Sequence, residues 1–408
     1  MTAAAELDAA AVAGAVEVVA GVARVTPVLS SRTLSDRTGG TVVLKAENLQ
    51  RTGSFKVRGA TAKLAALGDQ GCRGGVVCAS AGNHAQAVAY AARVRGVPCE
   101  VFVPAEAPIT KVEAAAELGA VVHRAGASVD ECLAQALARA EEGPAFVHPF
   151  DDRDVIAGQG TVGFELLDQV DDLARIVVPV GGGGLASGLA VAVKSARPEV
   201  EVVGVQVERC AAYAASLGAG HPVEVDAGLT IADGIAVKRP GELTLPLVRR
   251  WLDGVVTVGE DELAEAMVLL LERAKLVVEG AGAVGVAALL GGQVAPASSG
   301  VTTVILSGGN VDAGLLAEVA RRHETEVGRR VVILTRVDDR PGALARLLAV
   351  VAEAGANLIT VGHVREGVPL HVRESAVELV LGTRGRDHAA AVLDAIGAAG
   401  YEARTLRA

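Results

Sequence analysis

The sequence predicts an α/β protein with a parallel-sheet core, followed by a smaller ferredoxin-like βαββαβ domain. Between about residues 41 and 310, short apolar strands alternate with alanine-rich helical segments. These strands lack the polar alternation of a half-exposed sheet, so we expect helices to cover both of their faces. Beyond residue 330 the order of strands and helices changes, which marks a second domain.

The first domain is expected to contain eight strands, with helices such as Ala85–Val94 and Val112–Leu118 between them. The alanine-rich N-terminus, residues 1–25, predicts a further helix. The predicted strands are Val42–Ala46, Val76–Ala79, Glu100–Val103, Val121–Arg124, Ile176–Val180, Val202–Val207, Val255–Val258 and Thr302–Leu306.

A charged connector, residues 323–329, separates the first domain, residues 1–322, from the second, residues 330–408. Within the first domain, about residues 50–150 are expected to form a small subdomain inserted in a larger one. The second domain follows the order βαββαβ. Its predicted elements are strand Val331–Val337, helix Gly342–Ala354, strand Leu358–Val364, strand Ala376–Leu381, helix His388–Ala399 and strand Tyr401–Leu406.

Composition and charge exclude several classes of protein. The formal net charge is −10, which argues against nucleic acid or an anionic membrane as partner. The longest weakly polar stretch, residues 280–292, is too short and too rich in glycine to span a bilayer, and the N-terminus lacks the basic residues of a signal peptide. The five cysteines include no Cys-x-x-Cys pair, so we expect reduced thiols in a cytoplasmic protein and no metal site.

Lys56 is the most informative residue of the chain. It lies in the segment Gly53–Ala60, which forms a turn and then begins a helix. An inward-facing lysine is costly to bury unless it has a partner or takes part in covalent chemistry. Desolvation lowers its pKa and frees the amine for a Schiff base, so Lys56 is a candidate anchor for pyridoxal phosphate (PLP).

Two further motifs follow predicted strands and could bind anions. The loop after Val76–Ala79 contains small residues and opens a helix, which suits a carboxylate. The residues of this loop are Ser80, Ala81, Gly82, Asn83 and His84. The tetraglycine loop after Ile176–Val180 lets the backbone approach a phosphate closely, and its residues are Gly181, Gly182, Gly183 and Gly184.

The tetraglycine loop also allows a different interpretation. Gly181, Gly183 and Ala186 fit the pattern G-x-G-x-x-A, and Glu208 ends the next strand, where a ribose-binding acid would lie. This pattern would indicate an NAD-dependent oxidoreductase. A dinucleotide site, however, gives no role to Lys56 or to the Ser80–His84 loop.

The fourth motif is the segment Ser307–Asn310, which follows the strand Thr302–Leu306. A hydroxyl at the carboxyl end of a buried strand can contact a ligand ring in the crevice of the sheet. Together the four motifs supply a Schiff-base amine, a carboxylate site, a phosphate site and a partner for a ring nitrogen. This set is typical of a PLP enzyme that acts on an amino acid.

The chain resembles the threonine dehydratases (threonine ammonia-lyases) of the fold-type II PLP enzymes, whose fold is like the tryptophan synthase β-subunit, with a C-terminal ACT domain. The resemblance covers nearly the whole chain and includes the four motifs. The matching segments are residues 44–60, 80–89, 149–166, 179–188, 230–241, 278–283 and 306–310.

This resemblance implies a role for each motif. Lys56 would bind PLP covalently and, once released, take the substrate α-proton, with Phe55 beside the cofactor ring. Asn83 would contact the ring hydroxyl, the four glycines the phosphate, and Ser307 the pyridine nitrogen. The Ser80–His84 loop would bind the substrate carboxylate, and Glu279 would lie near the site.

The implied reaction is β-elimination of L-threonine to 2-oxobutanoate and ammonia, and of L-serine to pyruvate, as in the first step of isoleucine biosynthesis. Serine racemases of this fold carry a second serine where this chain has Ala81, so racemisation is disfavoured. No second acid accompanies Glu208, with Ala212 and Ala214 following it, so a divalent metal site is disfavoured while a monovalent cation stays compatible.

The C-terminal domain resembles an ACT domain through Asp338–Leu344 and Ala356–Leu358. This resemblance implies an amino-acid effector, isoleucine or valine, bound near Asp339, Pro341, Gly342 and Asn357, and assembly into a homodimer or homotetramer.

The alternatives for the function of the whole protein that stay open are a serine-preferring or catabolic dehydratase, a non-enzymatic amino-acid sensor and, more distantly, the NAD-dependent oxidoreductase.

Overall fold

The computed structural model describes residues 7–364 and 369–406. The first six residues of the predicted N-terminal helix and residues 365–368 and 407–408 of the predicted second domain lie outside the described residues. The chain divides into two compact units, Met1–Val311 and Asp312–Ala408.

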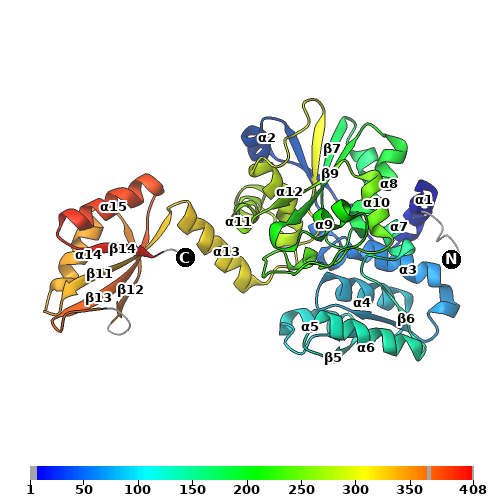
Figure 1. Cartoon of the computed structure of the whole chain (residues 1–408), viewed down its shortest axis with the longest axis horizontal. Helices are drawn as coiled ribbons and strands as arrows, with labels where there is room; N and C mark the ends of the chain where they lie inside the picture. Colours follow the sequence, from blue (N-terminus) through cyan, green and yellow to red (C-terminus); the bar gives the residue numbers. More distant parts are fainter. Residues whose placement is uncertain (1–6, 365–368, 407–408) are drawn as a thin grey trace. The chain divides into compact units, whose positions relative to one another are not determined.

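The first unit contains two sheets, which Figure 1 shows in separate parts of the unit. The larger sheet has the order β1-β2-β10-β7-β8-β9, and every neighbouring pair is parallel except β1 and β2 at one edge. Its strands are β1 (Val28–Ser30), β2 (Thr41–Lys45), β7 (Leu173–Pro179), β8 (Glu201–Val207), β9 (Gly254–Val258) and β10 (Val301–Ile305).

The smaller sheet has the order β5-β4-β3-β6 and is parallel throughout. It lies within the part of the chain predicted as an inserted subdomain. Its strands are β3 (Val76–Ala79), β4 (Cys99–Val103), β5 (Val121–Arg124) and β6 (Ala145–Phe146). The predicted α/β fold with a parallel-sheet core is confirmed.

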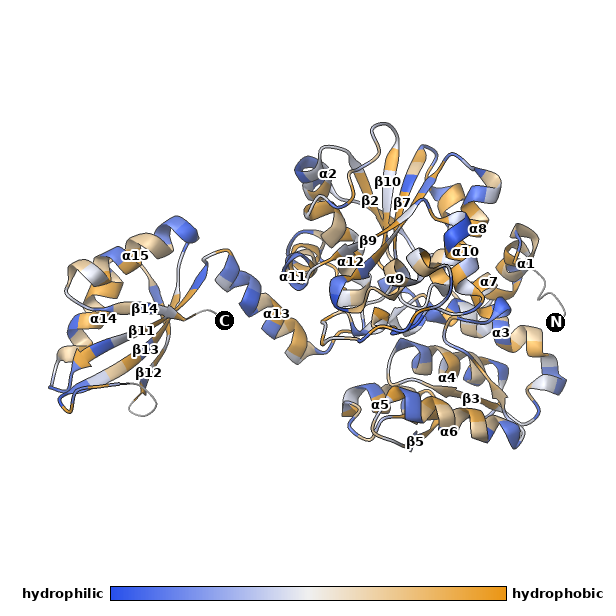
Figure 2. Ribbon diagram, in the orientation of Figure 1, coloured by the Kyte–Doolittle hydropathy of each residue, from blue (hydrophilic) through white to orange (hydrophobic). Residues whose placement is uncertain are grey.

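Alanine, valine and leucine dominate the core between helices and sheets, as expected for a chain with 2% aromatic residues. Hydrophobic colours predominate along β2, β7 and β10 in Figure 2. The helices of this unit are α1 (Ala9–Ala20), α2 (Arg32–Thr38), α3 (Lys56–Gly71), α4 (Asn83–Arg95), α5 (Ile109–Glu117), α6 (Val129–Glu141), α7 (Arg153–Gln169), α8 (Gly184–Ala196), α9 (Ala212–Ala219), α10 (Thr244–Trp251), α11 (Glu260–Leu269) and α12 (Gly280–Leu290).

The second unit begins with helix α13 and continues as a βαββαβ fold. Its antiparallel sheet has the order β12-β13-β11-β14, which is the ferredoxin-like arrangement. The elements are α13 (Ala313–Glu326), β11 (Arg330–Asp338), α14 (Ala343–Glu353), β12 (Asn357–Val364), β13 (Glu374–Gly382), α15 (Arg386–Ala398) and β14 (Ala403–Leu406).

The structure differs from the sequence-based prediction at the shortest elements and at the connector. Strands β1 and β6 span three and two residues, too few to show a periodic pattern. Residues 323–326 of the predicted connector form the last turn of α13. The charged pattern there, with Glu318 and Arg321 paired at 2.8 Å, supports an exposed helix, and no glycine lies between Leu315 and Val327.

No helix of the described residues combines the length and apolar character needed to cross a bilayer.

Candidate active site

Backbone hydrogen bonds join the segment before Lys56 to the segment that contains Ser307. The Phe55 amide donates to the Ser307 carbonyl at 3.1 Å, and the Gly309 amide donates to the Gly53 carbonyl at 2.9 Å. Gly53 has a φ of 72°, and an added Cβ would lie 2.3 Å from the Asn310 Oδ1. Only glycine fits this turn, which brings Lys56 and Ser307 to the same edge of the larger sheet.

The Lys56 side chain is half-buried at the first turn of α3. Its Nζ donates to the Pro149 carbonyl at 2.8 Å and lies 5.1 Å from the centroid of the Phe55 ring. Burial lowers the pKa of the Lys56 ammonium from an ordinary 10.5 to about 8, although the nearby Glu279 carboxylate opposes this shift. A substantial fraction of the amine is therefore neutral at mildly alkaline pH.

The Ser307 hydroxyl is buried beneath this segment. It donates to the Ala281 carbonyl at 3.4 Å, a long hydrogen bond, and only 3% of the residue is exposed. A hydroxyl has one donor hydrogen, so Ser307 would donate to a neutral ring nitrogen by turning this hydrogen away from the Ala281 carbonyl.

Asn83 begins α4 at the carboxyl end of β3 and belongs to a chain of three side chains. Its Nδ2 donates to Glu279 Oε1 at 2.7 Å, and its Oδ1 accepts from Asn310 Nδ2 at 2.7 Å. Burial, reinforced by the negative charge of Asp233, raises the pKa of the Glu279 carboxyl to about 7. Glu279 is therefore part of the site and can exchange a proton near neutral pH.

The other residues of the Ser80–His84 loop have different surroundings. Ser80, Ala81 and Gly82 are half-buried at the carboxyl end of β3, and the Gly82 amide donates to Ser80 Oγ at 3.1 Å. The His84 ring is turned inward, with Nε2 2.8 Å from the Val147 carbonyl. Burial lowers the pKa of His84 to about 3, so its ring stays neutral and cannot attract a carboxylate by charge.

The tetraglycine loop follows β7 and leads into α8, and close neighbours leave little room for a side chain at its four positions. Added Cβ atoms would meet the Phe150 ring at 2.1 Å from Gly182, the Tyr213 hydroxyl at 2.0 Å from Gly183 and Gln159 Oε1 at 2.6 Å from Gly184. A Cβ at Gly181 would lie 3.0 Å from Ile235 Cα.

The amides of this loop suit an anion. Within residues 7–364 and 369–406, no group accepts a hydrogen bond from the N–H of Gly182 or Gly183. These donors lie at the N-terminus of α8, whose dipole favours negative charge. A phosphate would supply the acceptors that the loop lacks.

The segment after β6 connects the amine to the glycine loop and was not predicted as part of the site. Pro149 accepts from Lys56, and the Phe150 ring covers Gly182. Asp151 accepts from the amides of Leu243 and Thr244 at 2.9 and 3.1 Å and thereby caps α10. The only indication in the sequence that this segment belongs to the site was that residues 149–166 match the threonine dehydratases.

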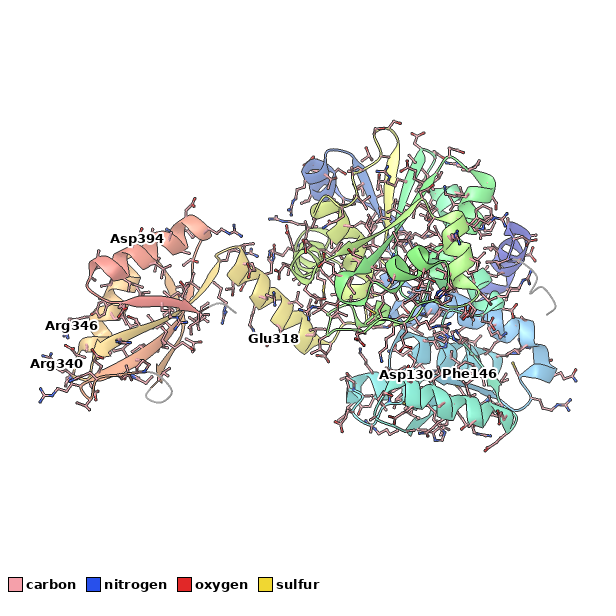
Figure 3. All side chains as sticks on the ribbon, viewed as in Figure 1. Asp130, Phe146, Glu318, Arg340, Arg346 and Asp394 are labelled. Atoms are coloured by element: carbon pink, nitrogen blue, oxygen red, sulfur yellow. The ribbon has the colours of Figure 1, made fainter. Side chains whose placement is uncertain are left out.

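The residues predicted to bind an effector do not all lie together in one chain. Asp339, Pro341 and Gly342 belong to the turn between β11 and α14. Figure 3 labels Arg340 in this turn and Arg346 in the helix that follows. Asn357 pairs with Gly382 at the end of the sheet opposite to the Asp338–Glu374 pair. A single chain therefore presents the turn and Asn357 at opposite ends of its sheet.

Among the described residues, no cluster of three or more His, Cys, Asp or Glu side chains is placed to hold a metal ion. What the site does offer is a primary amine of lowered pKa, loop amides without an acceptor among the described residues, and a buried hydroxyl. This arrangement can hold a carbonyl compound that carries a phosphate, because the amine can form a Schiff base while the amides bind the anion.

Comparison with known proteins agrees with this geometry. Residues 19–308 match the family model described as pyridoxal-phosphate dependent enzyme. The chain is 47% identical to the L-threonine ammonia-lyase of Thermotoga maritima over 375 residues, which cover 92% of this chain and 93% of that protein.

Two solved structures are similar to this chain over most of its length. A threonine deaminase from T.th. is 42% identical, with a TM-score of 0.70 over 75% of this chain and 99% of that one. The maize serine racemase is 36% identical, with a TM-score of 0.73 over 78% of this chain and 98% of that one.

Proposed function

The chain belongs to the family of pyridoxal-phosphate-dependent enzymes, and we propose that it is an L-threonine ammonia-lyase that also accepts L-serine. It is a PLP-dependent lyase by its similarity to relatives over most of its length. The products expected from L-threonine are 2-oxobutanoate and ammonia.

One observation carries this proposal. The alignment with the Thermotoga maritima L-threonine ammonia-lyase spans 375 residues, whereas the first unit ends at Val311. The similarity must therefore continue into the second unit. A relative that shares only the general PLP fold would not be expected to share this additional unit.

The residues that would hold PLP come from four segments. Lys56 would bind it covalently, the N–H groups of Gly181, Gly182, Gly183 and Gly184 would bind the phosphate, and Ser307 would contact the ring nitrogen. Phe55 and Asn83 would lie beside the ring. When bound, PLP supplies an electron sink for the electron pair left by the departing Cα proton.

Lys56 is the proposed base. Its lowered pKa keeps a neutral amine available, and this amine can accept the proton from the substrate Cα. The backbone of residues 80–83 would hold the substrate carboxylate and thereby orient the Cα–H bond, while the inward His84 ring supports the loop from below. Glu279, hydrogen-bonded to Asn83, is placed to hold or release a proton close to these groups.

Ser307 would favour elimination over slower competing reactions. A neutral hydroxyl cannot keep a pyridine nitrogen protonated, as a carboxylate would. Negative charge at Cα is then stabilised less, so prompt loss of the β-hydroxyl is favoured. The tetraglycine loop belongs to the region matched by the PLP family, which favours a phosphate site there over the dinucleotide site that its glycine pattern also allows.

We expect the rate of PLP capture by the apoprotein to rise with pH through a midpoint of about 8. Only the neutral amine attacks an aldehyde, and burial at Lys56 moves its neutral form to lower pH. Absorbance at the Schiff-base band, recorded in rapid mixing across a pH series, measures this rate. A midpoint near the ordinary value of 10.5 would contradict the assigned environment of Lys56.

The second candidate function is racemisation, which the similarity to the maize serine racemase raises. A racemase needs a proton donor on the face of the cofactor opposite Lys56. In serine racemases a serine supplies this proton, and the present chain has Ala81 at the corresponding position. We expect pyruvate to form from L-serine with no D-serine released, as checked by chiral chromatography. The variant Ala81→Ser serves as the positive comparison, and D-serine made by the wild type as fast as pyruvate would establish the racemase.

Substrate preference is tested by measuring kcat/KM for L-threonine and L-serine from the 2-oxo acid formed, with both substrates also present together. A higher value for L-threonine supports the proposal. A higher value for L-serine would reassign the enzyme as a serine-preferring dehydratase.

The second unit is proposed to be an ACT domain that places the first step of isoleucine biosynthesis under the control of isoleucine or valine. Its ferredoxin-like fold and the exposed turn with Asp339, Pro341 and Gly342 support this role. Because Asn357 lies at the other end of the sheet, an effector site using both would have to combine two chains, as in a homodimer or homotetramer. If neither isoleucine nor valine binds or changes the rate, this assignment fails.

The five cysteines are buried and free of disulfides, which suits a reducing compartment, and we place the enzyme in the cytoplasm.

A further inference from the structure

Two buried hydroxyl groups hold one carbonyl of the tetraglycine loop. The Gly182 carbonyl lies 3.0 Å from the Tyr213 hydroxyl and 2.8 Å from Thr244 Oγ1, and the two hydroxyl oxygens are 2.8 Å apart. Tyr213 and Thr244 are both 0% exposed. Both hydroxyls are shielded from bulk solvent, so these hydrogen bonds restrict the Gly182 peptide strongly.

The two hydroxyls are themselves fixed by neighbouring elements. The backbone amide of Tyr213, in α9, donates to Gln206 Oε1 at 3.0 Å, and Gln206 lies fully buried in β8. Thr244 opens α10 and accepts from the Gly241 amide at 3.1 Å. Asp151 caps the same helix, next to the Phe150 ring that covers Gly182.

Because the peptide between Gly182 and Gly183 is rigid, holding the Gly182 carbonyl also sets the direction of the Gly183 N–H. In a trans peptide the carbonyl and the following N–H point in opposite directions, and the described residues contain no cis peptide. Fixing the Gly182 carbonyl toward Tyr213 and Thr244 therefore directs the Gly183 N–H away from them. That N–H is one of the amides for which no described residue supplies an acceptor.

The close approach of Tyr213 also explains why position 183 is a glycine. Gly183 has a φ of 89°, and an added Cβ would lie 2.0 Å from the Tyr213 hydroxyl. The chain has three tyrosines, and this one is the only tyrosine among the fully buried large side chains of the described residues. The tyrosine can therefore lie this close to the loop only because position 183 has no side chain.

We propose that Tyr213 and Thr244 are positioning residues that orient the tetraglycine loop for the PLP phosphate. The segment Pro149–Asp151 connects this arrangement to Lys56, because Pro149 accepts from the Lys56 amine while Asp151 caps the helix that begins with Thr244. This connection fixes the Lys56 amine, which would bind the PLP aldehyde, relative to the glycine loop, which would bind the phosphate. The inference deepens the proposed function and rests on the cofactor it assigns.

The test compares PLP with pyridoxal, which has the same aldehyde and ring but no phosphate. The apoproteins of the wild type, Tyr213→Phe, Thr244→Val and the double variant are titrated with each compound, and the Schiff-base absorbance gives Kd. We expect Kd for PLP to rise about fivefold to tenfold in each single variant and on the order of 100-fold in the double variant. Kd for pyridoxal should change less than about twofold, because the aldehyde and Lys56 are untouched.

Matched variants distinguish a loss of loop orientation from a nonspecific loss of protein stability. Thr244→Ser keeps the hydroxyl and should restore PLP binding, whereas Tyr90→Phe and Thr302→Val remove hydroxyls outside the site and should leave both Kd values unchanged. An equal loss of PLP and pyridoxal affinity, no loss of either, or the same PLP-selective loss in the control variants would overturn the proposal. If the double variant does not fold, the single variants and the Thr244→Ser rescue decide.

These titrations use no amino-acid substrate, so their outcome is distinct from that of the proposed function. A wild type that binds PLP but forms no 2-oxobutanoate would refute only the substrate assignment. A wild type that forms 2-oxobutanoate and shows unchanged PLP affinity in Tyr213→Phe and Thr244→Val would refute only the positioning role.

Discussion

Replacement of Lys56 by alanine is expected to remove covalent PLP and to lower 2-oxobutanoate formation on the order of 10⁴-fold or more. The variant lacks both the Schiff-base amine and the base that accepts the Cα proton. Phosphate binding by the glycine loop should persist, so the cofactor should bind weakly and keep the absorbance of the free aldehyde. Borohydride reduction of the wild type followed by peptide mass spectrometry should place the label on Lys56.

The matched control for this experiment is Lys63→Ala. Lys63 lies two turns further along α3 and pairs with Asp152 at 2.6 Å and Asp154 at 3.1 Å, outside the site. We expect nearly full activity and a normal Schiff-base band in this variant. Activity retained in Lys56→Ala, or a borohydride label on another lysine, would contradict the role assigned to Lys56.

Replacement of Arg58 by methionine is expected to destabilise the first unit by about 3–5 kcal/mol. Arg58 is 1% exposed and donates to both carboxylate oxygens of Glu47 at 2.8 Å and to Glu165 at 2.7 Å. These contacts hold the pKa of the Glu47 carboxyl below its usual range, although burial opposes this shift. Without Arg58, Glu47 would keep a buried charge that lacks its main partner.

The loss should appear as a lower midpoint for the first unit in calorimetry or urea unfolding. Arg37→Met is the control, because Arg37 pairs with Glu265 on the surface and its loss should cost about 1 kcal/mol or less. The double variant Arg58→Met/Glu47→Leu should recover part of the stability, since it removes the unpaired charge. Equal effects of Arg58→Met and Arg37→Met would show that the buried pair contributes little.

The Arg58–Glu47 ion pair also supports the active site, because Arg58 lies close to Lys56 in the sequence. Glu47 lies in the turn after β2, and Arg58 lies in the first turn of α3, two residues beyond Lys56. Lys45 extends the cluster to Glu165 and to Gln169, whose Oε1 is 2.8 Å from Lys45 Nζ. Loss of Arg58 should therefore loosen the start of α3 as well as lower the stability of the unit.

The sequence was sufficient to predict where the main site residues gather. The four glycines and Ser307 follow β7 and β10, which are neighbours in the larger sheet, and the carboxyl ends of parallel strands share one edge of a sheet. Local patterns could therefore predict that these two segments lie close together, whereas Asn83 follows β3 of the smaller sheet and reaches them through packing. The order of strands and helices beyond residue 330 predicted the ferredoxin-like unit for the same reason.

The contacts that depend on distant parts of the chain could not be predicted in this way. The inward turn of His84 depends on the Val147 carbonyl, 63 residues away. The contact of Asn83 with Glu279 spans 196 residues, and that of Tyr213 with Gly182 spans 31. Periodicity identifies elements, whereas these contacts follow from how the elements pack. The separation of Asn357 from the β11–α14 turn similarly follows from the register of the sheet.

The central claim, elimination from L-threonine at the Lys56 site, is tested most directly by product analysis of the purified holoenzyme. L-Threonine should yield 2-oxobutanoate and ammonia in equal amounts, with no nicotinamide dinucleotide added, and Lys56→Ala should yield neither. If the wild type forms no 2-oxobutanoate, or consumes L-threonine only when a nicotinamide dinucleotide is supplied, the assignment as a threonine ammonia-lyase is wrong.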